Sequence, residues 1–204
     1  MRGFTFLLNC DIIYIMNIFI LDKSPGCAAR QHCDKHVVKM IIEAAQMLST
    51  THRILDGTLY QDKTRNGRNI KRWRLEENND LFYKGVHVNH PCTIWTRKSK
   101  QNYDWHYELF IALCDEYTYR YGKVHESDRK LRTLLKASPS NIDDVGLTEW
   151  PQCMPDYCKD KDPIQAYRNY YKNEKKDFAV WTARKTPNWF TDKHIKHRGL
   201  YQLS

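Results

Sequence analysis

The 204-residue sequence has no long and uninterrupted apolar segment. Its apolar N-terminal stretch, residues 1–15, is broken by Asn9, Cys10 and Asp11, so it is too short and too polar to cross a membrane. The same stretch lacks the small-residue cleavage site of a secretory signal peptide. We therefore expect a cytoplasmic protein with no membrane association. If a virus encodes it, it would lie in the host cytoplasm, or in the nucleus of a eukaryotic host.

The cysteines show no regular pairing. Their number is odd, their spacings are irregular, and no Cys-x2-Cys pair occurs among them: Cys10, Cys27, Cys33, Cys92, Cys114, Cys153 and Cys158. The pattern argues against a disulfide framework and favours reduced thiols. Because no paired knuckle is present, it also argues against a zinc site, and we expect no metal and no cofactor.

One metal alternative stays open. His32 and His36 stand four residues apart, a helical spacing that lets two imidazoles bind one ion. The remaining ligands would have to come from elsewhere in the chain, the candidates being His90, Cys92, Cys153 and Cys158. Nothing in the sequence brings these groups together, so the simpler interpretation is that the cysteines are small buried apolar residues.

Signals for β-strands are weak, and the sequence contains no internal repeat and no low-complexity tract. We therefore expect a mainly α fold: a single compact helical domain with two long helices, a long basic loop and a C-terminal helix. The domain would span residues 16–190. Residues 1–15 would be a non-native or disordered extension, because Met16 is followed at once by a well-formed extended start, and residues 191–204 would be a basic tail.

Start and stop signals place four helices. A cap residue followed by Pro91 starts the second helix, and Gly122 is its expected stop. The predicted helices cover about residues 28–55, 91–121, 127–136 and 163–182. Residues 17–22 are predicted to be extended. Residues 57–89 are predicted to form a polar loop, whose length is uncommon in a compact domain unless the loop is functional.

The most informative stretch is HCDKHVVKMIIE at residues 32–43. In a helix, its polar residues form one stripe that continues to Gln46: His32, His36, Lys39, Glu43 and Gln46. The other faces are apolar, so the helix should be largely buried. The stripe would then face either a thin strip of solvent or a cleft. A cleft lined by these ionisable groups would carry chemistry.

Lys39 and Glu43 are the candidates for amine and acid–base chemistry. A lysine among apolar neighbours can act as a nucleophile, and Glu43, one turn later, could serve as a general base or stabilise a cation. His32 and His36 would be polar contacts or proton carriers. The simpler alternative is an ordinary helical salt bridge between Lys39 and Glu43.

The net charge of +9 favours a polyanionic partner, with nucleic acid ahead of an anionic membrane surface. The predicted loop contributes one set of cations: Arg65, Arg68, Lys71, Arg72 and Arg74. The C-terminal segment interleaves aromatic residues with a second set: Arg168, Lys172, Lys175, Lys176 and Arg184. Cations bind phosphates, and exposed aromatics stack on unpaired bases. The alternative is that the aromatics pack inward and leave only the cations to contact a ligand.

Several of these motifs resemble known proteins. Met16-Asn-Ile-Phe-Ile-Leu-Asp, HCDKHVVKM at residues 32–40 and Asn89-His-Pro-Cys resemble a group of uncharacterised phage and bacterial proteins. The layout is also distantly similar to the pyrimidine-dimer DNA glycosylases of the phage endonuclease V type. The similarity rests on a short extended N-terminus, a His-Pro start of a long helix that closes at Arg120-Tyr121-Gly122, and an aromatic end at Trp189-Phe190.

The second resemblance implies a small, basic and mostly helical DNA glycosylase. Members of that family attack the sugar C1′ with the α-amine of the residue after the initiator methionine, assisted by a glutamate of the first helix. The lesion base is displaced through a Schiff-base intermediate. With Met16 as the start, this amine would belong to Asn17. The chain departs from the pattern near the expected glutamate, where Lys39 stands and Glu43 follows one turn later.

We therefore expect a DNA-acting enzyme of the glycosylase or lyase type that works on a damaged or modified nucleotide, with no obligate protein partner. Its candidate catalytic residues are Asn17, His32, His36, Lys39 and Glu43. Two alternatives stay open: a non-catalytic nucleic-acid-binding protein, and a metal-dependent hydrolase or transferase acting on a nucleotide. Fold analogy alone does not transfer function.

Overall fold

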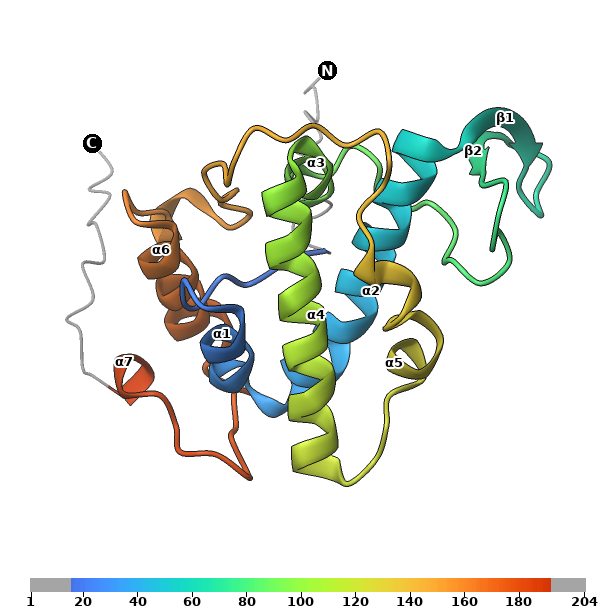
Figure 1. Cartoon of the computed structure of the whole chain (residues 1–204). Coiled ribbons are helices and arrows are strands. Elements are labelled where there is room, and N and C mark those ends of the chain that lie inside the picture. The colour runs from blue at the N-terminus through green and yellow to red at the C-terminus, as the bar shows by residue number, and fades with distance from the viewer. Residues whose placement is uncertain (1–15, 192–204) are drawn as a thin grey trace, which may run out of the picture.

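The computed structural model describes residues 16–191, which contain seven α-helices and one antiparallel sheet of two strands (Figure 1). In chain order the elements are α1 (Pro25–Gln31), α2 (Asp34–Asp56), β1 (Thr58–Lys63), β2 (Asn69–Arg74), α3 (Pro91–Lys98), α4 (Lys100–Tyr121), α5 (Glu126–Leu131), α6 (Pro163–Tyr170) and α7 (Asn188–Thr191). The expected extension at 1–15 and nearly all of the expected basic tail at 191–204 lie outside the described residues.

Helix α4 lies at the centre, and α1, α2 and α3 pack against it (Figure 1). The residues that follow Met16 run through this core in an extended conformation and pair with no strand among the described residues. Their side chains are buried, including both Ile18 and Phe19. Phe19 has a φ of 51°, a left-handed conformation that is uncommon for an aromatic residue. The N-terminal segment is therefore part of the core.

The predicted fold class, mainly α with a long basic loop, is wrong because that loop contains a β-hairpin. β1 pairs with β2 in antiparallel register, with Leu59 opposite Trp73, so the described chain is mixed α/β, although mainly helical. The turn between the strands depends on Gly67, which has a φ of 74° and donates its N–H to the Thr64 carbonyl at 2.9 Å. Asn66-Gly67 is a strong hairpin signal that reading the stretch as a loop overlooked.

Arg53 joins α2 to the hairpin and to the segment after it. Its guanidinium is almost fully buried and donates to the carbonyls of Trp73 at 2.8 Å, Phe82 at 3.0 Å and Tyr83 at 2.6 Å. It also binds the backbone and side chain of Asn79. These hydrogen bonds connect α2 to the backbone of the hairpin and to the segment that follows it.

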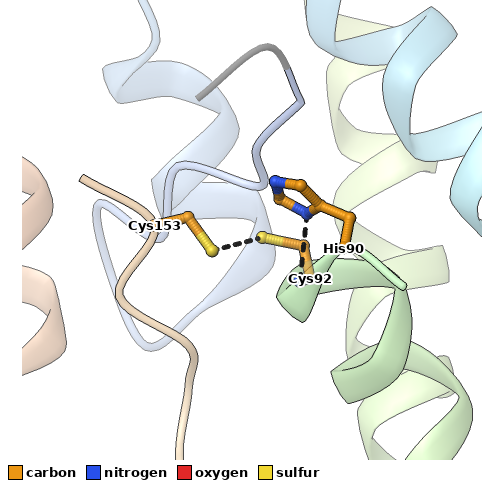
Figure 2. A group of neighbouring side chains, drawn as sticks. All are labelled: His90, Cys92 and Cys153. Carbon is orange, nitrogen blue, oxygen red and sulfur yellow. Dashed lines mark hydrogen bonds between the residues drawn. The ribbon is translucent and has the colours of Figure 1, made fainter. Parts of the chain in front are cut away.

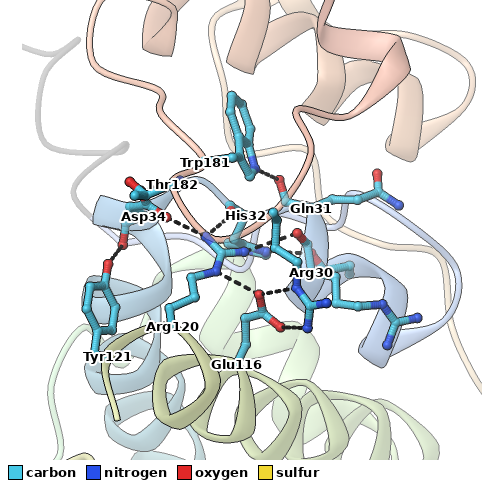
Figure 3. Close-up of polar contacts among 11 residues, drawn as sticks. Arg30, Gln31, His32, Asp34, Glu116, Arg120, Tyr121, Trp181 and Thr182 are labelled. Atoms are coloured by element: carbon cyan, nitrogen blue, oxygen red, sulfur yellow. Dashed lines mark hydrogen bonds and ion pairs between the residues drawn. The ribbon is translucent and has the colours of Figure 1, made fainter. Parts of the chain in front are cut away.

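The first predicted helix is not continuous, because His32 and Cys33 adopt extended backbone angles between α1 and α2. Contacts with segments distant in the sequence stabilise the non-helical backbone at this break (Figure 3). Arg120 donates to the His32 carbonyl at 3.0 Å and to the Asp34 carboxylate at 2.8 Å, and the Asp34 N–H donates to the Val180 carbonyl at 2.8 Å. His32 is consequently the residue after α1 and does not belong to the polar stripe of α2.

For the second and last predicted helices, the predicted starts are confirmed, but neither helix is continuous over its predicted length. The second long helix begins at Pro91 and stops at Gly122, which has a φ of 64°, but it is divided at Ser99 into α3 and α4. The Lys100 N–H donates to the Asp143 carbonyl at 2.8 Å beside this division. The last predicted helix ends at Tyr170 and continues only as a π-helical turn, Tyr171–Lys175.

Candidate active site

Glu43 is the centre of the candidate site. The residue is only 6% exposed, and each oxygen of its carboxyl group has one partner. The backbone N–H of Asn17 donates to Oε2 at 2.9 Å, and the Lys39 ammonium lies 3.0 Å from Oε1. The Lys39 side chain is 58% exposed, so it bridges the buried carboxyl and the solvent. Three of the five predicted catalytic residues, Asn17, Lys39 and Glu43, are thus in direct contact.

Burial raises the pKa of Glu43 above its ordinary value. The hydrogen bonds from Lys39 and Asn17, and the positive potential of His87, oppose this rise without cancelling it. The raised pKa means that Glu43 retains a proton more readily than an exposed glutamate does. This is the property required of a general acid or base.

The side chain of Asn17 fixes the backbone nitrogen against Glu43. Its Nδ2 donates to the Cys153 carbonyl at 2.7 Å, and its Oδ1 accepts the N–H of Ile18 at 2.9 Å. Asn17 is itself 2% exposed. Both ends of the amide are therefore held, and the Asn17 nitrogen has a defined direction toward the carboxyl group.

His36 and His32 lie in a different environment, although His36 is only one turn before Lys39. The rings pack among buried aromatic residues: the Phe19 ring lies 4.5 Å from the His36 ring, centroid to centroid, and Tyr171 OH lies 2.5 Å from His36 Nδ1. Nδ1 of His32 lies 2.8 Å from the Ala28 carbonyl. Burial lowers the pKa of His36 to about 2 and that of His32 to about 4. Both imidazoles are neutral near pH 7 and fit a core role better than proton transfer.

The C-terminal cations divide into two groups. Arg168 and Arg184 serve the fold: Arg168 donates to the Leu21 carbonyl at 3.0 and 3.2 Å, and Arg184 donates to both oxygens of Glu116 at 2.9 Å. Lys175, in contrast, is close enough to Lys39 for their like charges to interact. Its ammonium lies 4.4 Å from the Tyr170 ring centroid. Lys172 is half-buried and Lys176 is exposed. The structure therefore brings part of the C-terminal set to the candidate site.

The hairpin carries the other predicted cations away from Glu43. Asp56, the last residue of α2 and the start of the path to the hairpin, lies about 20 Å from Glu43 along the helix axis. The side chains of Arg65, Arg68, Lys71 and Arg74 are exposed. Arg72 is instead half-buried and paired with Asp62 at 2.9 Å. The two basic regions thus lie near opposite ends of α2 (Figure 1).

Two further features lie near the candidate site: one that the sequence did not signal, and one whose residues the sequence offered only as additional ligands for a metal site at His32 and His36. One is His87, which has a φ of 48°, a value that is uncommon outside glycine, and which lies close enough to Glu43 to interact with its carboxyl group electrostatically. The other is a buried group of His90, Cys92 and Cys153, which Figure 2 shows next to one another. It is the one group of three neighbouring metal-ligating side chains between residues 16 and 191, and it does not include His32 or His36. The sequence signals no proximity, because 61 residues separate the two cysteines.

No protein-family model, no curated protein and no solved structure matches the chain. No helix within residues 16–191 has the length and apolarity needed to cross a membrane. None of the six described cysteines is in a disulfide.

Proposed function

We propose that this protein is a DNA-acting enzyme of the glycosylase or lyase type that works on a damaged or modified nucleotide in the cytoplasm. The observation that carries the proposal is the 2.9 Å contact between the Asn17 nitrogen and the buried Glu43 carboxyl group. A nitrogen nucleophile paired with an acid–base carboxyl group is the minimal apparatus for Schiff-base chemistry at a sugar. The resemblance between this chain and the pyrimidine-dimer glycosylases implies the same two partners.

The reaction would follow from these two groups. An amine nitrogen forms a bond to the sugar C1′ while the bond between C1′ and the base breaks, and the base leaves with the bonding electron pair and takes up a proton. Opening of the sugar ring then gives an iminium ion. Glu43, with its raised pKa, is placed to deliver a proton, and in its ionised form it stabilises the iminium charge.

Two nitrogens beside Glu43 are candidates for the nucleophile, and they differ in chemistry. Within the 204-residue chain, the Asn17 nitrogen is a buried amide, whose lone pair is delocalised into the carbonyl group. It becomes a nucleophilic α-amine only in a protein that begins at Asn17. The Lys39 side chain is 58% exposed and supplies its amine nitrogen in either protein. A comparison of the 204-residue protein with a form that begins at Asn17 therefore distinguishes attack by the Asn17 α-amine from attack by the Lys39 amine.

DNA would approach along the lysines near Glu43, chiefly Lys39 and Lys175, and the exposed hairpin would supply additional phosphate contacts. Exposed hairpin cations such as Arg65 and Arg68 suit a sequence-independent contact with the backbone. Extrusion of the target nucleotide from the duplex would then bring its sugar to the amine.

Borohydride trapping tests the proposal. The 204-residue protein and a form that begins at Asn17 are incubated with labelled duplexes that carry an abasic site, a thymine dimer or a modified pyrimidine. We expect a covalent adduct that Glu43→Gln reduces at least tenfold. An adduct restricted to the Asn17 form identifies the α-amine, whereas an adduct formed by both proteins and lost in Lys39→Ala identifies Lys39.

Lys100→Ala is the matched control. Lys100 pairs with Asp104 one turn later on α4, as Lys39 pairs with Glu43, but both members of this pair are exposed. Its removal should leave trapping unchanged. If no substrate gives an adduct although DNA binding is salt-sensitive, the glycosylase proposal fails and a non-catalytic nucleic-acid-binding protein replaces it.

A further inference from the structure

The buried group beside Asn17 has the composition of a metal site. His90 and Cys92 come from the start of α3, and Cys153 comes from an irregular segment far along the chain (Figure 2). One ligand atom from each side chain lies within 4.8 Å of the other two, and the two sulfur atoms are 3.4 Å apart. Cys92 is fully buried, Cys153 is 3% exposed and His90 is 9% exposed.

We propose that His90, Cys92 and Cys153 bind one divalent metal ion of the zinc type. Thiolate and imidazole are the ligands that zinc prefers, and they occur together in tetrahedral sites. Zinc–sulfur bonds of about 2.3 Å in a tetrahedron place two sulfur atoms about 3.8 Å apart. The sulfur atoms of Cys92 and Cys153 would have to separate by only a few tenths of an ångström. Three protein ligands leave the fourth position for a water molecule.

Charge balance supports an ion at this depth. Cys92 and Cys153 are both buried, so a thiolate at either position needs a compensating cation. An incoming ion with two positive charges would displace one proton from each cysteine, and both protons would pass to the solvent. Two thiolates, a neutral imidazole and the ion together carry no net charge, which avoids the cost of burying an uncompensated charge.

The ion would fix three segments around the candidate site. The segment that carries Cys153 has no helix or strand between residues 137 and 155, so it has few internal hydrogen bonds to define its path. Asn17 binds the Cys153 carbonyl, and its Oδ1 lies 3.9 Å from the Cys92 sulfur. A metal cross-link would therefore hold α3, the irregular segment and the N-terminal segment together behind the contact between Asn17 and Glu43. This inference does not depend on the glycosylase proposal.

Metal content and cobalt spectroscopy test the site. The untagged 204-residue protein, purified with a non-thiol reductant, should contain about one zinc ion per chain. Cobalt exchanged into the apoprotein should give a thiolate-to-cobalt charge-transfer band and the strong visible absorption of tetrahedral cobalt. Cys92→Ser and Cys153→Ser should abolish the band. Cys158→Ser is the control, because Cys158 is equally buried but lies outside the group.

If a serine variant does not fold, a cysteine-labelling experiment on the protein without substitutions tests the metal site instead. Bound zinc should protect Cys92 and Cys153 from alkylation, and a chelator should remove the protection, whereas the half-buried Cys27 should react in both conditions. The inference is overturned if folded protein takes up neither zinc nor cobalt. It is also overturned if metal binds equally to both serine variants, or if the isolated protein holds a disulfide between Cys92 and Cys153.

Discussion

Glu43 and Glu116 are buried to nearly the same extent, 6% and 4% exposed, yet their pKa values shift in opposite directions. Burial pushes both values upward. At Glu116, hydrogen bonds from Arg184 and Arg120 overcome burial and hold the pKa below its ordinary value. At Glu43, the hydrogen bonds from Lys39 and Asn17 do not, and the pKa stays raised.

The difference lies in the partners. Glu116 receives three hydrogen bonds from two guanidinium groups, and the Arg120 side chain is itself only 2% exposed (Figure 3). These hydrogen bonds favour the charged form of Glu116, which joins α4 to the break before α2 through Arg120. Glu43 has one N–H donor and one lysine that extends into solvent. Burial alone therefore does not determine the direction of the pKa shift; it also depends on how many cations contact the carboxyl group and how exposed they are.

Removing the buried Arg120 guanidinium should produce the largest change in stability. In Arg120→Ala, Glu116 keeps only Arg184 and the His32 carbonyl loses its donor, so we expect the free energy of unfolding to fall by about 3–5 kcal/mol. Urea denaturation at neutral pH measures this change. Lys39→Ala is the counterpart at Glu43 and should change stability by less than about 0.5 kcal/mol, because its cation is exposed. Equal losses in the two variants would show that the two sites are alike.

The dependence of stability on pH should have opposite signs at the two glutamates. The lowered pKa of Glu116 stabilises the folded protein above the unfolded pKa, and this contribution is lost as the pH falls through the folded pKa. The raised pKa of Glu43 does the reverse, because its contribution is complete below the unfolded pKa and is lost as the pH rises through the folded pKa.

Urea midpoints of the wild type, Glu43→Gln and Glu116→Gln between about pH 3 and about pH 7 measure these slopes. The stability advantage of the wild type over Glu116→Gln should grow with pH, and its advantage over Glu43→Gln should shrink. Parallel curves would contradict the distinction between the two carboxyl groups.

The smallest predicted effects are those of removing one further cation near each glutamate, Lys175 near Glu43 and Arg184 at Glu116. Lys175→Ala should weaken DNA binding several-fold and lower the slope of log affinity against log salt by about 1, because Lys175 lies on the side of Lys39 and Glu43. Arg184→Ala should leave the affinity unchanged and reduce stability by about 1 kcal/mol, because its guanidinium is already paired with Glu116. Fluorescence anisotropy at several salt concentrations checks both. An affinity loss in Arg184→Ala alone would reverse the assignment.

Local rules predicted the capped helix ends. Pro91 and Gly122 mark a beginning and an end that depend only on the neighbouring backbone, and the structure confirms both. The contact between Lys39 and Glu43 follows from four-residue spacing on a helix, and it is present. Asn66-Gly67 is likewise a local signal, and it lies in the turn of the hairpin that the polar-loop prediction did not include.

The sequence by itself determined where helices can start and stop, which faces are apolar and which ionisable groups share a turn, because these properties depend on residues within a few positions of one another. Only the tertiary structure decided that the Asn17 nitrogen meets Glu43 across 26 residues, that Cys92 meets Cys153, and that the first helix breaks at His32. Those arrangements exist because segments distant in the sequence bury these groups and supply the hydrogen bonds that compensate for burying polar groups and for interrupting a helix.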